Sequence, residues 1–270
     1  MMTPREVVAA TIACTGPDRL ARSFPAPYGN DFGGVGMSPS PDARPGTGTD
    51  EWGAVWENIG VCKLGEVKEF PIKEWTEFDP ADAPDITMES RWSQLVGARE
   101  RAGEQYMLAG GISLYERVHF LRGLENTWTD LYTNPGDLRG LIDILVEMNL
   151  YAIERYQVAE ADGFIFCDDW GLQDRLMISP EKWREFWKPA YARVYAAARA
   201  AAASLPGALL HGVVWPTERQ RRAAVGFAGG CRGRRHGEQA GDELRRGRAR
   251  YGAGTEGGCC PPNLTGPSVP

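Results

Sequence analysis

The sequence lacks several features that mark familiar classes of protein. No run of about 18 apolar residues occurs, so we expect no membrane-spanning helix and no membrane partner. The N-terminal residues MMTPREVV contain no extended apolar segment, so we expect no secretory signal and a cytoplasmic protein. None of the six cysteines has CxxC or another metal-ligand spacing, so we predict reduced thiols and no metal site. Histidine is also scarce, with only His119, His211 and His236.

Charge is distributed unevenly along the 270 residues. Residues 200–270 contain ten arginines and five acidic residues, a net charge of +5, which leaves −11 for residues 1–199 within the total of −6. An acidic body is unfavourable for contact with phosphate backbones, so we expect no nucleic-acid partner. The 43% hydrophobic content and nine tryptophans are sufficient for a core, in one large α/β domain or two small ones.

The most informative stretch is ADGFIFCDDWG, residues 161–171. Its apolar run FIFC is too short for a helix and rich in residues that favour strands, which predicts a buried strand of a parallel sheet. The run ends in Asp168, Asp169, Trp170 and Gly171. Side chains at the carboxyl ends of parallel strands face the ligand site in α/β folds, so we predict a catalytic role for both aspartates. Turn formation is their alternative role.

Helices and strands alternate around this stretch. A second short strand is predicted at residues 106–111, and a helix follows it at 112–123. Apolar residues at helical spacing predict a further helix at 134–161, capped by its first residue, an asparagine. Ser179 caps the next helix, which Pro189 must kink or interrupt. The order strand, helix, strand, helix predicts βαβ units and a parallel sheet.

The N-terminal part of the chain gives weaker signals. Residues 22–50 are rich in Gly, Pro, Ser and Asp and predict a long loop, in which Asn30 and Asp31 are candidate site residues. Alternating polar and aromatic residues predict a hairpin, appended to the main sheet, at residues 50–72. Residues 86–102 predict an amphipathic helix.

Three segments resemble one known family. They are ENIGVCKLGEVKEFPIKEW, GGISLYERVHFLRGLEN and ADGFIFCDDWGLQDRLMISPEKWREFWKPAYARV. These motifs and their spacing resemble the uroporphyrinogen decarboxylase family, which also contains corrinoid-dependent methyltransferases. The resemblance covers roughly residues 3–200 and is most specific at residues 162–191. It implies a (β/α)8 barrel, so we predict an α/β fold that is an incomplete TIM barrel, with a partial barrel domain at residues 1–200.

The resemblance also implies site residues around a deep pocket at the carboxyl end of the barrel. Asp168 corresponds to a polar residue that contacts substrate in the decarboxylases, and His119 lies close to the position of a substrate-contacting tyrosine. Together with the two loop residues, the expected substrate contacts are Asn30, Asp31, His119, Arg122, Gly123, Trp170 and Gly171. A core role for His119 and a surface ion pair between Glu116 and Arg122 remain as alternatives.

Three interpretations remain open: a decarboxylase, a methyltransferase and an inactive remnant. A porphyrinogen decarboxylase needs no cofactor and uses an aspartate to stabilise a protonated pyrrole, but the arginine-containing N-terminal motif of these lyases is reduced here to Arg22. A corrinoid-dependent methyltransferase needs a zinc-bound thiolate, which this family holds with a His-x-Cys pair and a later Cys. His211 stands at the expected place but Val213 replaces the cysteine, so no zinc ligands are visible. The expected partner is a small-molecule tetrapyrrole or a corrinoid protein.

Residues 201–270 do not continue the family pattern. They contain no Lys, Ile or Met, but ten arginines and fourteen glycines, and no periodicity extends beyond Trp215. We expect a frame-shifted translation of GC-rich DNA or a comparable gene-model error, with a natural basic arm as the alternative. A (β/α)8 barrel needs about 250 residues and closes when its last strand pairs with its first. The chain as given should therefore have an open sheet edge, low stability and no activity.

Resequencing the DNA that encodes residues 195–215 tests the frame-shift hypothesis. We expect one inserted or deleted base, whose correction restores a His-x-Cys motif and the remaining strands. A reading frame that is intact as given contradicts the hypothesis.

Overall fold

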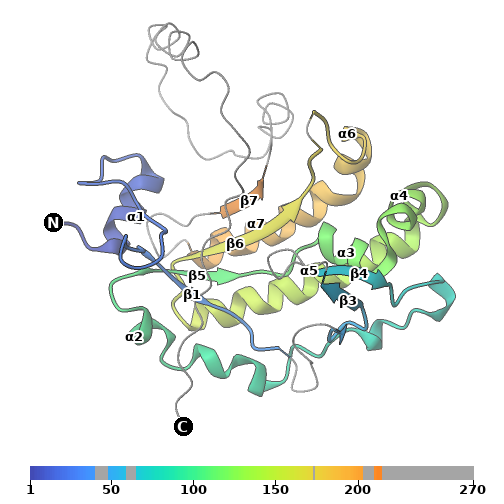
Figure 1. Ribbon diagram of the computed structural model, residues 1–270, viewed down its shortest axis with the longest axis horizontal. Helices are drawn as coiled ribbons and strands as arrows, with labels where there is room; N and C mark the ends of the chain where they lie inside the picture. The colour runs from blue at the N-terminus through green and yellow to red at the C-terminus, as the bar shows by residue number, and fades with distance from the viewer. Residues whose placement is uncertain (40–47, 59–64, 173, 203–209, 215–270) are drawn as a thin grey trace, which may run out of the picture.

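A parallel sheet of four strands organises the protein (Figure 1). The structure is a computed structural model that describes residues 1–39, 48–58, 65–172, 174–202 and 210–214. In chain order, its elements are α1 (Pro4–Ala13), β1 (Phe32–Val35), β2 (Gly48–Thr49), β3 (Val55–Asn58), β4 (Gly65–Glu69), three 3₁₀ helices (Trp75–Glu77, Pro80–Asp82 and Glu89–Leu95), α2 (Ala98–Ala102), β5 (Tyr106–Gly110), α3 (Tyr115–Arg122), α4 (Leu124–Thr133), α5 (Pro135–Val158), β6 (Gly163–Asp169), α6 (Pro180–Lys182), a π-helical turn (Trp183–Trp187), α7 (Lys188–Ala202) and β7 (Leu210–Val214).

The strand order of this sheet is β1-β5-β6-β7, and all neighbouring strands are parallel. Phe32 lies opposite Tyr106, and Leu108 lies opposite Gly163. Helices α3, α4 and α5 connect β5 to β6, and α6 and α7 follow β6. The mixed α/β fold with a parallel sheet, predicted from the alternation of helices and strands, is therefore confirmed.

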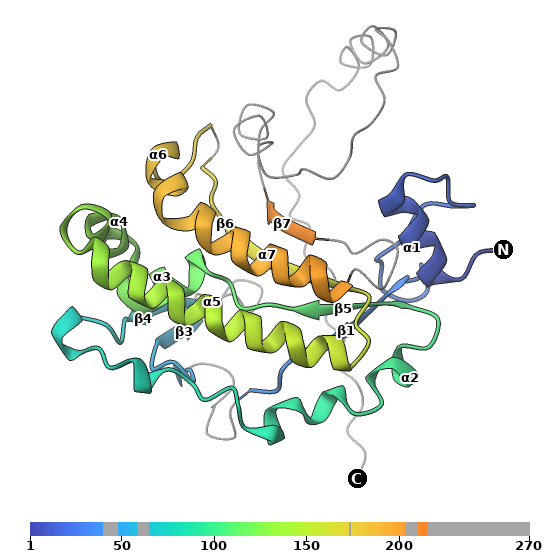
Figure 2. The same ribbon diagram turned by 180° about the vertical axis from the view of Figure 1, so that it is seen from behind.

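Helices α5 and α7 cover one face of the sheet, as Figure 2 shows. Phe164 and Phe166 of β6 pack against tyrosine rings of α5 and α7, at centroid distances of 6.4 and 5.7 Å. Successive side chains of a strand point to opposite faces, so Ile165, Cys167 and Asp169 point away from this helical layer. We call the face that they occupy the open face of β6.

Strand β1 lies within residues 22–50, which the sequence predicted as a loop, and this part of the prediction is wrong. Gly33 and Gly34 make up half of the strand, and their low strand propensity hides it from a sequence pattern. Pairing with β5 forms the strand nevertheless, and the Tyr106 N–H donates to the Asp31 carbonyl at 2.9 Å where the pairing begins.

The hairpin predicted at residues 50–72 exists, but it is not appended to the main sheet. Strands β2, β3 and β4 form a separate antiparallel sheet. Trp56 of β3 packs 4.9 Å from the ring of Phe120 on α3, and Arg117 of α3 donates to Asp50 at 3.1 Å. The small sheet therefore docks on α3 rather than on a strand edge.

The amphipathic helix predicted at residues 86–102 is wrong as a single element. The segment divides into a 3₁₀ helix and the short α2, with Gly97 between them at φ +66°. Arg91 of the 3₁₀ helix is 1% exposed and donates to Glu51 at 2.8 and 3.0 Å. A buried ion pair thus replaces the exposed polar face that the pattern predicted.

Helix α5 matches the helix predicted at residues 134–161 except at its ends. Asn134 does not cap it, because its side-chain amide donates to Asp130 at 2.7 Å instead. Although α5 has 24 residues, no helix among the described residues is long and apolar enough to cross a membrane.

The helical segment after β6 has an irregular turn just before Pro189, but α7 itself continues through this proline, so the predicted interruption at Pro189 is not found. Ser179 caps α6 by accepting from the Lys182 N–H at 3.3 Å. The π-helical turn follows at once and ends two residues before Pro189. Proline has no N–H and its ring crowds the preceding turn, so a wider turn just before it relieves the conflict.

The tail domain predicted at residues 201–270 lies mostly outside the described residues. Residues 201–202 end α7, and residues 210–214 form β7. The domain division at residue 200 stays a prediction.

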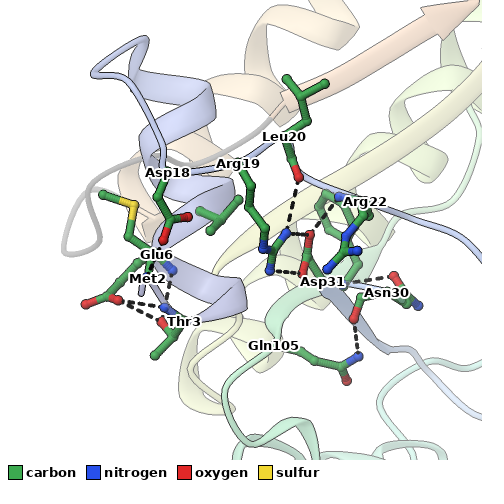
Figure 3. Close-up of polar contacts among 12 residues, drawn as sticks. Met2, Thr3, Glu6, Asp18, Arg19, Leu20, Arg22, Asn30, Asp31 and Gln105 are labelled. Atoms are coloured by element: carbon green, nitrogen blue, oxygen red, sulfur yellow. Dashed lines mark hydrogen bonds and ion pairs between the residues drawn. The ribbon is translucent and has the colours of Figure 1, made fainter. Parts of the chain in front are cut away.

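Two buried carboxylates at the amino-terminal ends of the strands are paired with arginines. Asp162, just before β6, accepts from Arg99 of α2 at 2.6 Å and also contacts Arg5 of α1. Asp31, just before β1, accepts from both terminal nitrogens of Arg19 at 2.7 Å (Figure 3). These ion pairs fasten the N-terminal segment and α2 to the sheet.

Replacement of Asp162 tests how much this fastening contributes. Asp162→Asn removes the carboxylate that pairs with Arg5 and Arg99, so we expect the free energy of unfolding to fall by about 3 kcal/mol. Asp143→Asn is the control, because Asp143 pairs with Arg193 on the surface and such pairs contribute at most about 1 kcal/mol. Urea denaturation of both variants measures the difference. Equal losses would contradict the structural role of Asp162.

Candidate functional site

Asp168 lies near the carboxyl end of β6 and is only 5% exposed. One carboxylate oxygen accepts from the Leu114 N–H at 2.9 Å and from the Tyr191 hydroxyl at 2.6 Å. The other accepts from the Glu116 N–H at 2.8 Å. These donors belong to α7 and to the N-terminus of α3, so the carboxylate connects β6 with both helices.

The hydrogen-bond donors of Asp168 are uncharged, in contrast to those of the buried carboxylates at the opposite ends of the strands. Burial raises the pKa of Asp168 above its ordinary value, and the donors offset only part of this effect. At Asp31 the hydrogen bonds from Arg19 lower the pKa of the carboxyl instead. A buried titratable group with a shifted pKa is a candidate functional group, and Asp168 also lies at the carboxyl end of a parallel strand, so we take this end of β6 as the candidate site.

Aromatic rings surround Asp168. Trp170 is fully buried, stacks on Tyr115 at a centroid distance of 3.8 Å and lies 5.2 Å from Trp187. Its indole N–H donates to the Tyr191 hydroxyl at 3.0 Å. Trp170 therefore supports the hydrogen bonds of Asp168 from within the core.

Asp169 is exposed and belongs to the open face of β6, together with Cys167. Its side chain accepts from the Gly171 N–H at 3.0 Å, which orients the carboxylate just beyond the strand. The two aspartates thus have different environments. Asp168 is enclosed by protein, whereas Asp169 is free to contact a ligand.

Helix α3 brings two more titratable groups toward these carboxylates. His119 is half-buried between the rings of Tyr115 and Phe120, and burial, aided by the charge of Arg117, lowers its pKa to about 4. Burial also raises the pKa of Glu116, and the negative charges of Asp168 and Asp169 add to this effect.

His119 is therefore neutral at pH 7, and Glu116 is easier to protonate than an ordinary glutamate. Near the carboxyl end of β6, Glu116 is thus the group better suited to take up a proton, whereas neutral His119 can donate or accept a hydrogen bond.

Arg122 and Gly123 belong to a different cluster. The Arg122 guanidinium is buried, donates to Asp130 at 2.8 Å and also bonds the carbonyls of Ile72 and Lys73. Gly123 ends α3 at φ +85°, where a side chain would be strained and would meet a phenylalanine ring at 3.3 Å. The structure thus places both residues where α3 meets the chain after β4, and the surface pair of Arg122 with Glu116 does not form.

Asn30 and Asp31 lie just before β1 (Figure 3). Asp168 lies near the carboxyl end of β6, so these residues occupy opposite ends of the parallel strands. Asp31 is held by Arg19, and the Asn30 side chain accepts from the Phe32 N–H at 3.0 Å. The structure therefore brings Asp168, Asp169, Trp170, Gly171 and His119 together and separates them from Asn30, Asp31, Arg122 and Gly123.

Sequence reasoning missed Tyr191 and Tyr115. Tyr191 of α7 follows Trp187, the last residue of the π-helical turn, by four residues, a spacing that places two side chains on one face of a helix. A buried tyrosine hydroxyl needs a hydrogen-bond partner, so a tyrosine on an apolar helical face was an available signal. Its partner, a carboxylate 23 residues earlier, could be identified only from the fold.

No group of three or more His, Cys, Asp or Glu side chains that could hold a metal ion occurs among the described residues. His211 lies on β7, where it pairs with Ile165 of β6. Cys259 and Cys260, which could supply a later thiol ligand, lie outside the described residues. The described residues therefore do not fit a zinc site.

A cavity of about 200 Å³ lies between β1 and α2, away from Asp168. Its lining includes Gly33, Gly34, Gln94, Arg101 and Gln105. It contains neither a carboxylate nor a nucleophile, so we assign no chemistry to it.

No protein-family model matches the chain, and no curated protein matches its sequence. Among solved structures, it is similar to a methyltransferase from Methanosarcina mazei, with a TM-score of 0.54 and 13% sequence identity. The similarity covers 79% of this chain and 70% of the methyltransferase. At this identity the comparison shows a shared fold.

The pKa of His119 predicts a pH dependence of stability. The folded protein holds the pKa at about 4, below the ordinary value of 6.5, so between these values the unfolded chain binds more protons. Stability should therefore rise as the pH rises from 4 to 6.5, by up to about 3 kcal/mol from this group. His119→Gln should remove that part of the rise in urea titrations. An unchanged pH profile would show that His119 is solvated in the folded state.

Proposed function

We propose that the chain is a methyltransferase-related protein with an incomplete (β/α)8 barrel, and that it binds a corrinoid at the carboxyl ends of its strands. The similarity to the Methanosarcina mazei methyltransferase supports the fold. The parallel order β1-β5-β6-β7, with helices on one face, is what consecutive strands of such a barrel would show.

The observation that carries the proposal is the position of Asp169. It is an exposed carboxylate at the carboxyl end of a parallel strand, on the face that α5 and α7 leave uncovered. Gly110 ends the neighbouring β5, and a side chain there would meet no atom within 4 Å. A carboxylate beside open space can accept hydrogen bonds from a ligand.

The charge of this region favours a corrinoid over a porphyrinogen. Asp168, Asp169 and Glu116 are all acidic, and they repel a ligand that carries many carboxylates. A corrinoid instead carries neutral amide groups at its periphery, whose N–H donors suit an acidic acceptor. When bound, the corrinoid would supply the cobalt-bound methyl chemistry, while Asp169 would orient the ring and neutral His119 could form a hydrogen bond nearby.

Decarboxylation of a porphyrinogen, the main expectation from the family resemblance, has less support. It needs fixed cations for the substrate carboxylates. The two arginines of α3 nearest the site have other partners, because Arg117 pairs with Asp50 and Arg122 pairs with Asp130. The described residues also offer no cluster of three or more zinc ligands, so we derive no zinc-dependent step.

Binding of cobalamin tests the proposal. We expect the full chain to bind aquocobalamin, with a change in visible absorption, and to bind uroporphyrin at least tenfold more weakly. Asp169→Asn should weaken cobalamin binding about tenfold, because a charge-assisted hydrogen bond is lost. Asp143→Asn is the matched surface control and should bind like the wild type. Preference for uroporphyrin would favour the decarboxylase, and binding of neither would favour an inactive remnant.

A further inference from the structure

Helix α3 has no N-terminal cap from its own sequence. Leu114 stands at the cap position with helical φ and ψ angles of −86° and −58°, and its side chain provides no cap hydrogen bond. The N–H groups at a helix start need acceptors, and a buried helix start without them is costly. Here Asp168 of β6 accepts from Leu114 and Glu116 and so caps the helix from a remote strand.

The hydrogen bonds around Asp168 have a defined direction. An indole N–H can only donate, so Trp170 donates to the Tyr191 oxygen at 3.0 Å. The Tyr191 hydroxyl in turn donates to Asp168 at 2.6 Å. Together with the two backbone N–H groups, every partner of the carboxylate donates to it, which suits the ionised form.

We propose that Tyr191 is a positioning residue of the candidate site, because its hydroxyl keeps Asp168 an ionised acceptor that fixes the start of α3 against β6. Glu116 and His119 are carried by α3, whereas Asp169 is carried by β6. The cap therefore sets where these groups lie relative to one another. Which ligand these groups contact rests on the proposed function. Their positioning by the cap on α3 does not.

Burial disfavours the ionised form of Asp168. The hydrogen bond from the Tyr191 hydroxyl, the third donor besides Leu114 and Glu116, is therefore important. The titratable groups whose pKa is raised by the charge of Asp168 are Tyr115 and Glu116 on α3 and Tyr191 and Tyr195 on α7. None of these described groups is a cation, and the hydrogen bonds from Leu114, Glu116 and Tyr191 favour the ionised carboxylate. Removing the Tyr191 hydroxyl should raise the pKa of Asp168 further and loosen the cap.

The test compares Tyr191→Phe with Tyr156→Phe. Tyr156 is also buried, and its hydroxyl accepts from the Met37 N–H at 2.9 Å, so its loss removes a comparable hydrogen bond elsewhere. In native-state hydrogen exchange by NMR, we expect Tyr191→Phe to speed exchange of the Leu114 and Glu116 amides at least tenfold more than Tyr156→Phe does. The carboxyl ¹³C resonance of Asp168 should titrate at higher pH only in Tyr191→Phe.

Equal exchange and an unchanged Asp168 titration in the two variants would overturn the proposal. The wild type supplies a second measurement that needs no variant. Protection of the Leu114 and Glu116 amides should fall over the same pH range in which Asp168 takes up its proton. Protection that does not change over this range would also overturn the proposal. Both readouts are made without a ligand, so failure of cobalamin binding leaves them interpretable.

Discussion

The arrangement of the candidate site depends on one buried carboxylate. Asp168 has two backbone N–H groups and one hydroxyl as partners, and these come from α3 and α7. Because this carboxylate of β6 holds the start of α3, it helps to set the position of the site groups of α3 relative to those of β6. Its neighbour Asp169, one residue further along the strand, points the other way and is exposed. Alternation along β6 thus separates a residue that organises the site from one that can touch a ligand.

The two ends of the sheet use charge differently. At the amino-terminal ends, arginines neutralise Asp31 and Asp162 and tie the periphery to the strands. At the carboxyl end, dipoles rather than cations surround Asp168. Ion pairs are suited to holding elements together, whereas an acid held by dipoles keeps the capacity to change its charge. This division agrees with α/β folds in general, in which stability resides at one end and chemistry at the other.

The sequence predicted the features that local patterns encode. The strand at 161–171 and the helix at 134–161 were predictable because apolar periodicity is strong there. Strand β1 was not, because its glycines carry no pattern and only pairing with β5 creates it. The same limit applied to the site. That Asp168 and Asp169 end a strand was readable, but which of them faces the helices depends on packing, and Tyr191 as the partner of Asp168 depends on the fold.

The π-helical turn has a consequence for insertions and deletions in this chain. Such a turn holds one residue more than an α-helical turn, and each residue of an α-helix rotates the direction of the side chain by about 100°. The wide turn takes up this extra residue within a single turn, so the residues of α7 keep the phase of an uninterrupted helix. A deletion within Trp183–Trp187 would convert the turn to regular helix and leave Tyr191 facing the sheet, whereas a deletion in α7 just before Tyr191 would rotate this side chain by about 100°. When sequences are aligned with this one, a one-residue gap within this short segment is therefore compatible with the same role for the tyrosine.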